Sequence, residues 1–422
     1  MDKIITVAII GCGGRGCRTY GRLIRDSFAD KFKVVALCDI NPSVLNLQKE
    51  KLGIDPENTF LNEQDFFSRK RADLLIVATQ DRDHARMTLA GMKLGYDVLV
   101  EKPLSSSEEE CLELLKVQKE TGRKVMVCHV LRYAPAYAKV EEILNSGVIG
   151  RVVSITALEQ VNYVHYAHSF VRGNWHSEKE TSPMILAKCC HDLDLIQHYA
   201  GSGCASVSSF GDLTWFKPEN APDSHAERCI DCEHIDTCPY SAKQIYLDNW
   251  KKNPGYVFSS IMTYPNPLNE EEILNGLRTG KYGRCVYGGY NDVVDHQMVS
   301  MLFDNGVTAT LTMMAFTGNG GRDIRIFGTH GDIHFSEDTD TLDLFVHGVK
   351  WNKWKLSDLI KCEAGSHAGG DYMLIKDLYE VMSGQKEAPT SLEESVESHL
   401  IGIAAEKSRH SGGKLIPVHC AQ

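Results

Sequence analysis

Short apolar runs alternate with segments of helical periodicity over the first 125 residues. Runs that are apolar at every position are typical of parallel strands that helices cover on both faces. Arg15–Asp26, between the first two runs, has the pattern of a helix. The pattern therefore predicts a doubly wound α/β domain over residues 1–125. The apolar runs are Ile4–Ile10, Lys33–Cys38, Leu74–Thr79 and Val98–Val100.

From Arg151 onward the pattern changes to successive hairpins. Met298–Phe316 predicts two strands around the turn Asp304-Asn305-Gly306, and the segments IRIFGTHGDIHF and LDLFVHGVKW repeat this signature. Consecutive hairpins predict an α+β domain over residues 126–422 with a large, mainly antiparallel sheet. A Pro-, Asn- and Cys-containing stretch at about 215–284 is interpreted as an insertion in that domain. Ser391–Gly413 is expected to be a helix with a capping Ser391.

Composition excludes several classes of protein. A chain of 422 residues usually forms two or three domains, and 43% hydrophobic with 24% charged residues is typical of a soluble protein. A net charge of −11 without any basic block argues against a nucleic-acid partner. No apolar stretch approaches the roughly 20 residues of a membrane-spanning helix, so no membrane partner is expected. The N-terminal run is interpreted as a strand and not a signal peptide, and the 14 cysteines are expected to be reduced in a cytoplasmic protein.

A glycine-rich turn, GCGGRG, directly follows the first predicted strand and fits the G-x-G-x-x-G pattern of dinucleotide sites. Gly11 would permit the tight turn, Gly13 would let the backbone approach a diphosphate, and Gly16 would let the helix pack closely on the strand. The diphosphate would lie on amides at the start of a helix, so an acidic protein can still bind this anion.

Asp39 ends the second predicted strand, where a carboxylate can bind the ribose hydroxyls of NAD and repel the 2′-phosphate of NADP. We therefore predict NAD as the cofactor. NADP is the less favoured alternative, left open because Arg15 and Arg18 could accommodate a 2′-phosphate. The residues of this turn and strand that are predicted to bind the cofactor are Gly11, Gly13, Gly14, Arg15, Gly16 and Asp39.

The segment Val77–Ser105 strongly resembles the Gfo/Idh/MocA family of NAD(P)-dependent oxidoreductases, which act mostly on sugars, inositols and their derivatives. The marks are Ala78-Thr79, His84 and above all the triplet Glu101-Lys102-Pro103. The resemblance continues through Arg132–Ile155, the HDLDL of residues 191–195 and the C-terminal SVESHLIGIAAEKSR, so it covers nearly the whole chain.

The resemblance implies a Rossmann domain followed by a domain whose open sheet forms the floor of the substrate pocket. It also implies homodimers or homotetramers that pack through that sheet. By the same resemblance Lys102 lies beside the nicotinamide and the reacting hydroxyl, with Thr79, His84 and Glu101 in the cofactor site. The role of Lys102 is chemically sensible, since a desolvated or cation-crowded lysine has a lowered pKa and can exchange a proton with a hydroxyl.

The segment Ser182–Gly201 departs from the family pattern. The family usually has an aspartate four residues before a catalytic histidine; His191 matches the histidine, but Ala187 stands in place of the aspartate. The segment predicts one helix with a polar stripe of Lys188, His191 and Asp194 facing the pocket. We predict neutral His191 as the base and Lys188 as a ligand of the substrate. A core histidine and a solvated lysine are the structural alternatives.

Further polar side chains could line the same pocket and would suit a polyol. Any one of them could equally be structural. The predicted substrate contacts are His129, Arg132, Trp175, Asp194, Asp295, His296 and His367.

Cys229, Cys232 and Cys238 have a C-x2-C-x5-C spacing within the insertion. Packed thiols are the favoured interpretation, a structural zinc with His225, His234 or a distant cysteine as fourth ligand is next, and a disulfide is last. No catalytic metal is expected, because hydride transfer with lysine and histidine does not require one.

These observations predict an NAD-dependent oxidoreductase that transfers hydride between the nicotinamide and a secondary hydroxyl of a sugar, inositol or sugar derivative. The first alternative is an NAD-dependent glycosidase that works by transient oxidation, elimination, hydration and reduction. A non-catalytic sensor of NAD and sugar is the second alternative.

Overall fold

The computed structural model describes residues 3–360 and 367–419. Its N-terminal part is a six-stranded sheet in the order β3-β2-β1-β4-β5-β6, and every neighbouring pair is parallel. The doubly wound α/β prediction is therefore confirmed. The strands are β1 (Ile5–Ile10), β2 (Phe32–Cys38), β3 (Thr59–Phe60), β4 (Leu74–Val77), β5 (Asp97–Val100) and β6 (Val125–Val127).

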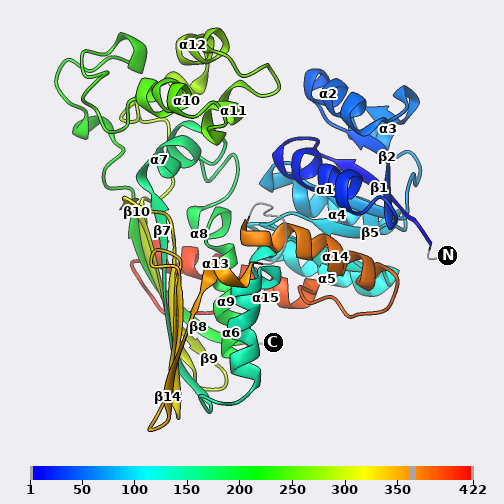
Figure 1. Cartoon of the computed structure of the whole chain (residues 1–422), viewed down its shortest axis with the longest axis vertical. Helices are drawn as coiled ribbons and strands as arrows, with labels where there is room; N and C mark the ends of the chain where they lie inside the picture. Colours follow the sequence, from blue (N-terminus) through cyan, green and yellow to red (C-terminus); the bar gives the residue numbers. More distant parts are fainter. Residues whose placement is uncertain (1–2, 361–366, 420–422) are drawn as a thin grey trace.

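Helices cover both faces of this sheet (Figure 1). They are the π-helical turn η1 (Gly14–Gly21), α1 (Arg22–Ser27), α2 (Pro42–Leu52), α3 (Glu63–Phe66), α4 (His84–Lys93) and α5 (Glu108–Thr121). Helix α14 (Gly370–Met382) returns from the far end of the chain and buries Leu374, Ile375 and Leu378 in the same core. A helix from the C-terminal part of the chain thus completes the core around the first sheet.

The second part is built on a nine-stranded sheet in the order β14-β13-β12-β11-β7-β10-β9-β8-β15. Only β7 and β10 are parallel neighbours, so the prediction of a large, mainly antiparallel sheet is confirmed. The strands are β7 (Val152–Asn162), β8 (Cys204–Asp212), β9 (His296–Phe303), β10 (Thr308–Thr317), β11 (Gly321–Gly328), β12 (Gly331–Ser336), β13 (Thr341–Val346), β14 (Lys350–Lys355) and β15 (Ile416–Pro417).

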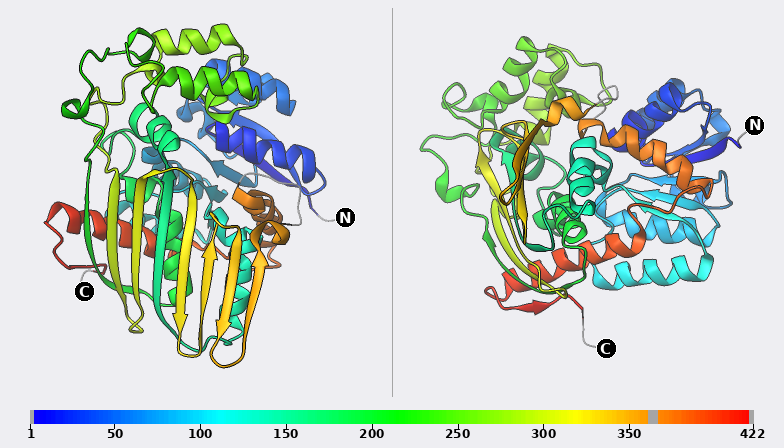
Figure 2. Two further views of the ribbon diagram at one scale, coloured as in Figure 1. Left: turned by 60° about the vertical axis from the view of Figure 1, so that its left-hand side comes forward. Right: turned by 60° about the horizontal axis from the view of Figure 1, so that its bottom comes forward.

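Helices cover one face of the second sheet and leave the other face uncovered (Figures 1 and 2). Alternation along β9 shows the reason: Val299 and Met301 are buried, whereas Met298 and Leu302 point outward and are 47% and 45% exposed. The covering helices are α6 (Pro135–Asn145), α8 (Met184–Ala187), α9 (Cys190–Ala200), α13 (Leu356–Leu359) and α15 (Leu392–His410). Ser391 caps α15 by accepting a hydrogen bond from the amide of Glu394, as expected.

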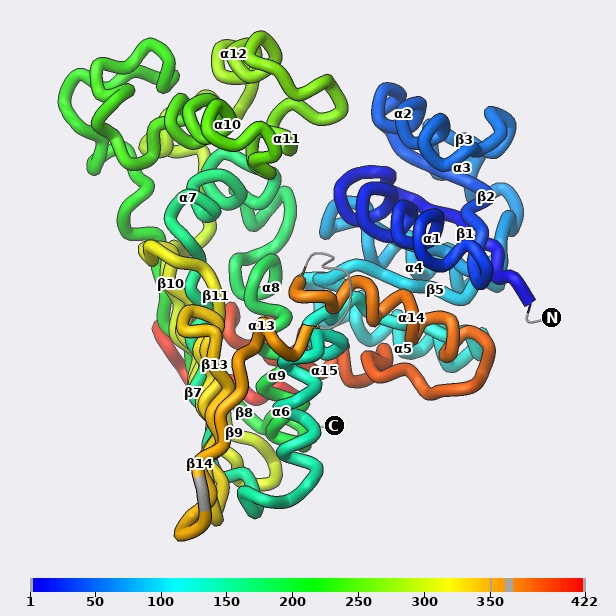
Figure 3. Tube along the Cα trace, in the orientation of Figure 1, coloured from blue at the N-terminus to red at the C-terminus, as the bar shows by residue number. Residues whose placement is uncertain are grey.

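The chain between β8 and β9 forms a separate group of helices beside the N-terminal part, at the top of the tube in Figure 3. Gln48 of α2 donates a hydrogen bond of 2.6 Å to the hydroxyl of Tyr264, and the guanidinium of Arg18 lies over the ring of Tyr264. The group therefore contacts η1 and α2 of the N-terminal part. Its helices are η8 (Lys243–Asp248), α10 (Asn249–Lys252), α11 (Val257–Thr263) and α12 (Glu270–Thr279), and they adjoin α7 (Tyr163–Tyr166) and η5 (Ala167–Arg172).

Within residues 3–360 and 367–419, every helix is too short or too polar to cross a bilayer.

Candidate active site

The glycine-rich turn has the backbone geometry that a dinucleotide requires. Gly11 has a φ of +88° and lies so close to the carbonyl of Ala78 that a Cβ could not fit there. A Cβ on Gly16 would collide with the carbonyl of Gly11. By contrast, the position of a Cβ on Gly13 faces open space, and no side chain caps the amides at the start of η1. These amides are free to bind a diphosphate.

A cleft of about 430 Å³ runs from this turn along the ends of β2 and β4. Asp39 lies in it, half-buried, and accepts hydrogen bonds from the amides of Cys12 at 2.7 Å and Asn41 at 2.8 Å. The two amides fix the carboxylate at the end of β2. Gly13 and Thr79 also line the cleft, so the predicted cofactor residues of three strand ends meet here.

Arg15 is held by carboxylates and does not extend into the 430 Å³ cleft. Its guanidinium pairs with Glu101 at 2.6 Å and with Asp371 of α14 at 2.7 Å. Burial by itself raises the pKa of Glu101, but Arg15 and the Tyr20 hydroxyl more than offset this and leave that pKa below its ordinary value. Arg15 therefore helps to keep Glu101 ionised. The two carboxylates hold its guanidinium outside the cleft in which a 2′-phosphate would lie.

The Glu101-Lys102-Pro103 segment is fixed from behind by His84. One ring nitrogen of His84 lies 2.7 Å from the carbonyl oxygen of Pro103, and the other lies 3.2 Å from that of Thr79. The ammonium of Lys102 donates a hydrogen bond of 2.8 Å to the carbonyl oxygen of Ala187. Lys102 thereby bridges the first sheet to the junction of α8 and α9.

A second cavity, of about 240 Å³, adjoins the cleft, and Ala78 and Thr79 line both. A cofactor in the cleft could reach this cavity past these two residues. The predicted site residues that line it are Arg15, Thr79, His84, Glu101, Lys102, Trp175, Lys188, His191 and His367.

The prediction of one continuous helix over Ser182–Gly201 is wrong. Helix α8 ends at Ala187, and α9 begins at Cys190. Because the chain turns between them, Lys188 points to β7 and pairs with Glu159 at 3.0 Å. Asp194 does not share a face with it and turns away from the cavity.

His191 is buried at the edge of the cavity with its Nδ1 atom lacking a hydrogen-bond partner. Burial lowers the pKa of His191 well below its ordinary value, and Lys102 and Arg322 lower it further. His191 is therefore neutral near pH 7 and can accept a proton. In the part of the chain that the structure describes, no carboxylate pairs with the His191 ring, in agreement with the alanine at position 187.

Four of the predicted substrate contacts do not line the cavity and instead contact other protein groups. They are Arg132, Asp194, Asp295 and His296. Arg132 forms two hydrogen bonds of 2.8 Å with buried Asp194, an ion pair that ties η4 (Val130–Tyr133) to α9. Buried Asp295 accepts hydrogen bonds from the amides of Thr214 and Trp215 and pairs with His296 at 2.9 Å. These contacts support the fold.

His129, the fifth, is buried behind the cavity. Its ring lies 6.1 Å from that of His191 and 5.8 Å from that of His399. Burial lowers the pKa of His129 despite Asp194, whose carboxylate is 3.8 Å away. His129 can only reach substrate through His191.

Trp175 and His367 do line the cavity. The indole of Trp175 donates a hydrogen bond of 3.1 Å to Asp81, which fixes the ring as a wall. His367 pairs with Asp371 at 3.0 Å and has a φ of +55°, a left-handed conformation that is rare for a residue with a side chain. Held strain of this kind is concentrated at functional sites.

Sequence reasoning missed a buried charge network beneath the cavity. Arg322 of β11 pairs with Asp192 at 2.8 Å and with Glu159 at 2.8 Å, and Glu159 in turn pairs with Lys188. The four residues come from β11, α9, β7 and the turn after α8, so local spacing could not reveal the network. A local signal is that Glu159 and Arg322 are charged residues within strands, β7 and β11.

The sequence also matches known protein families. The model described as "Oxidoreductase family, NAD-binding Rossmann fold" matches residues 5–129, and its companion, "Oxidoreductase family, C-terminal alpha/beta domain", matches residues 141–418; both are models of the Gfo/Idh/MocA group.

Three similar proteins illustrate the range. The Bacillus subtilis (strain 168) protein YteT is 22% identical over 88% of each chain. The 2,7-anhydro-N-acetylneuraminate hydratase of Mediterraneibacter gnavus is 26% identical over 50% of this chain and 53% of its own length. The solved structure of levoglucosan dehydrogenase in complex with NADH and levoglucosan has a TM-score of 0.71 at 16% identity, covering 99% of this chain and 100% of the other.

Proposed function

This chain belongs to the Gfo/Idh/MocA family of NAD-dependent oxidoreductases, and we propose that it moves a hydride between NAD and a secondary carbinol carbon of a sugar, inositol or sugar derivative. The observation that carries the proposal is the junction of two cavities at Ala78 and Thr79. The glycine-rich cleft fits a dinucleotide. Lys102 and His191 line the adjoining cavity, where they could contact a substrate beside the nicotinamide. NAD, when bound, accepts or returns the hydride.

Two side chains of the cavity can contact the substrate hydroxyl, Lys102 and His191. We assign the Nζ atom of Lys102 to hold the hydroxyl oxygen, since the Ala187 carbonyl already aims this ammonium into the cavity. Neutral His191 takes the proton during oxidation and returns it during reduction. Ala187 offers no side-chain carboxylate to pair with protonated His191. We therefore propose that the proton leaves His191 through the cavity that it lines.

Lys188 is assigned to a second hydroxyl or a carboxylate of the substrate. Its side chain is 22% exposed on the cavity side, while Glu159 holds its Nζ atom at 3.0 Å. Arg322 also pairs with Glu159 and shares in neutralising its charge. The positive charge of Lys188 is therefore not fully cancelled and can attract a polar group of the substrate. Trp175 provides an apolar wall for the ring of a sugar.

A second candidate function is glycoside cleavage by transient oxidation. Oxidation to a ketone acidifies the neighbouring C–H, elimination then expels the leaving group, and water addition and reduction complete the cycle. The pair of Lys188 and Glu159 beside His191 favours it, because elimination needs acid and base groups beyond those of hydride transfer. The similarity to a hydratase that acts on an anhydro sugar also supports this alternative.

One experiment separates the candidates. The purified protein, as isolated and with added NAD, is incubated with free sugars, inositols and p-nitrophenyl glycosides while NADH absorbance and nitrophenol release are recorded separately. NADH formation supports the dehydrogenase, and nitrophenol release without NADH supports the glycosidase. NAD binding with neither signal, together with unchanged biological activity of Lys102→Met, would favour the sensor.

We also propose that the chain forms a homodimer or homotetramer through the uncovered face of the second sheet. Large apolar side chains on this face are partly exposed, and a monomer rarely leaves such a patch in water. These side chains are Phe210, Met298, Leu302, Phe316, Phe327 and Trp351. A cytoplasmic location is proposed with it, supported by free thiols at every cysteine that the structure describes.

A further inference from the structure

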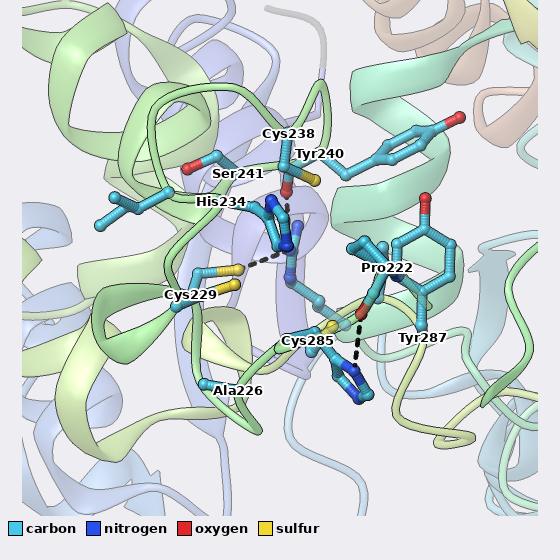
Figure 4. Close-up of a pocket in the computed structure, with 14 residues that line it drawn as sticks. Pro222, Ala226, Cys229, His234, Cys238, Tyr240, Ser241, Cys285 and Tyr287 are labelled. Carbon is cyan, nitrogen blue, oxygen red and sulfur yellow. Dashed lines mark hydrogen bonds between the residues drawn. The ribbon is translucent and has the colours of Figure 1, made fainter. Parts of the chain in front are cut away.

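Four cysteines line one small cavity in the chain between β8 and β9 (Figure 4). Cys229, Cys232 and Cys238 come from a loop of turns around the short helix η7 (Cys229–Asp231), and Cys285 comes from the segment before β9. Cys229 and Cys285 are each 8% exposed. The fourth cysteine that the C-x2-C-x5-C spacing lacks is therefore supplied by the tertiary structure.

Backbone pairing holds Cys285 in this position. Arg228 and Arg284 form an antiparallel bridge, and the amide of Cys285 donates a hydrogen bond of 2.8 Å to the carbonyl oxygen of Glu227. The two residues that precede the cysteines in sequence are thus paired, which places Cys229 and Cys285 side by side. Packing of thiols does not require four cysteines from two separate segments to line one cavity.

Arg172 provides an independent sign that a negative charge belongs here. It is 3% exposed, lines the cavity, and donates a hydrogen bond of 3.3 Å from Nη2 to the sulfur of Cys229. Its Nη1 atom is buried without a partner, and within residues 3–360 and 367–419 no carboxylate lies within ion-pair distance of the guanidinium. A buried cation without a counter-charge costs several kcal/mol, roughly, so a compensating anion is expected.

We propose that Cys229, Cys232, Cys238 and Cys285 bind one structural zinc ion as thiolates. Four thiolates around a divalent ion carry a net negative charge, which Arg172 would balance through its hydrogen bond to sulfur. The cavity of about 20 Å³ holds about one water-sized sphere. It therefore suits a single ion and is too small for an iron–sulfur cluster.

Binding requires the sulfur atoms to move inward. In a tetrahedral site with zinc–sulfur bonds of about 2.3 Å the sulfurs are about 3.8 Å apart. Among the residues described, three ligand atoms lie within 4.8 Å of one another only at Glu178, Glu406 and His410, so the four thiols are more widely spaced than this. That other group is already bridged by Arg409, which pairs with Glu178 at 2.8 Å and Glu406 at 2.6 Å. Three of the four cysteines lie in or beside the short helix η7 and outside every described strand.

The zinc would fix one wall of the substrate cavity. Arg172 is the last residue of η5, and Ser169 and Phe170 of the same turn line the cavity with Trp175. Arg172 also donates hydrogen bonds of 2.7 Å to the carbonyls of Arg284 and Tyr240. A zinc among the cysteines thus connects the loop, the segment before β9 and the cavity wall.

The test is the metal content of the full chain. The protein is purified without chelator from zinc-supplemented cells, and its zinc is measured by elemental mass spectrometry. About one zinc per chain is expected for the wild type. Cys229→Ser and Cys285→Ser should lose it. Cys111→Ser, which changes a buried thiol in α5 outside the cavity, is the matched control and should keep it.

Two measurements keep the test decisive if the serine variants do not fold. Cobalt exchanged into the wild-type chain should show the visible bands of a tetrahedral tetrathiolate site. Arg172→Gln should weaken zinc binding by about 10- to 100-fold in competition with a chelator, as loss of an outer partner does. Zinc-free folded wild type, zinc retained in both serine variants, iron with labile sulfide, or a disulfide among the four cysteines would each overturn the proposal.

Discussion

The ammonium of Lys102 lies 2.8 Å from the carbonyl oxygen of Ala187, the position at which the family resemblance predicts an aspartate. The contact uses the backbone, so it survives the loss of the aspartate side chain. It also leaves His191 without the carboxylate that would stabilise an imidazolium. The pair of Lys102 and His191, which we propose as catalytic, therefore has no side-chain carboxylate at position 187.

Restoring the carboxylate should change the pH dependence. In Ala187→Asp the new charge would favour protonated His191 and raise its pKa from its present low value. Since the neutral base is the active form for oxidation, the acidic limb of the kcat/KM profile should move to higher pH. The profile is measured beside that of Ala187→Asn, which has the same size without the charge. Identical profiles for the two variants would show that His191 is not the base.

Lys102→Met should lower kcat by about 10²- to 10³-fold, because the ammonium that holds the reacting hydroxyl oxygen and stabilises its developing negative charge is lost. NAD binding, followed by quenching of protein fluorescence, should remain, since the glycine-rich turn and Asp39 are untouched. Lys116→Met removes a 65% exposed lysine on α5 and serves as the control. A variant with normal kcat would remove Lys102 from the mechanism.

Asp39→Ala should weaken NADH binding by about 10- to 100-fold, the loss expected for hydrogen bonds to a charged group. NADPH binding should improve relative to NADH, because repulsion of the 2′-phosphate is removed. Fluorescence titration of both cofactors on one preparation provides the internal control. An unchanged NADH to NADPH ratio would contradict the assigned role of Asp39.

His399 makes the stability of the fold depend on pH. Its Nε2 atom accepts a hydrogen bond from the amide of Leu104 and its Nδ1 atom lies 2.6 Å from the carbonyl of Ser395, so the ring must be neutral. Burial lowers the pKa of His399 to about 3, with His129 as a further cause. The unfolded state therefore binds the proton first as pH falls, and the stabilisation present above about pH 6.5 is lost toward pH 3.

The check is denaturant unfolding of wild type and His399→Gln. Between about pH 7.5 and pH 5 the wild type should lose about 2 kcal/mol more of its free energy of unfolding than the variant. Equal losses would mean that His399 is not neutral in the fold.

The uncovered face of the second sheet gives the prediction on assembly. Wild type should be a dimer or tetramer by light scattering, and Met298→Glu with Leu302→Glu should shift it toward monomer because charges would be buried. Leu112→Glu, at a 49% exposed leucine of α5, should not. A monomeric wild type would refute this interface.

The sequence by itself determined the parts whose signals are local. Strands β1, β2, β4 and β5, the turn at Gly11–Gly16 and the hairpins of the second sheet each rest on a few consecutive residues, whose apolar pattern and glycine conformations constrain the backbone directly. The resemblance to a family added the roles of Lys102 and His191, which local pattern does not supply.

Only the tertiary structure decided which distant residues meet. The break between α8 and α9 turned Lys188 toward Glu159, and the register of β7 and β11 placed Arg322 beside Glu159. The return of α14 brought Asp371 to Arg15, and a two-residue bridge brought Cys285 to Cys229. Such contacts depend on how whole elements pack. A buried charge is paired across that packing because the free energy of leaving it unpaired exceeds the local conformational preferences of the chain.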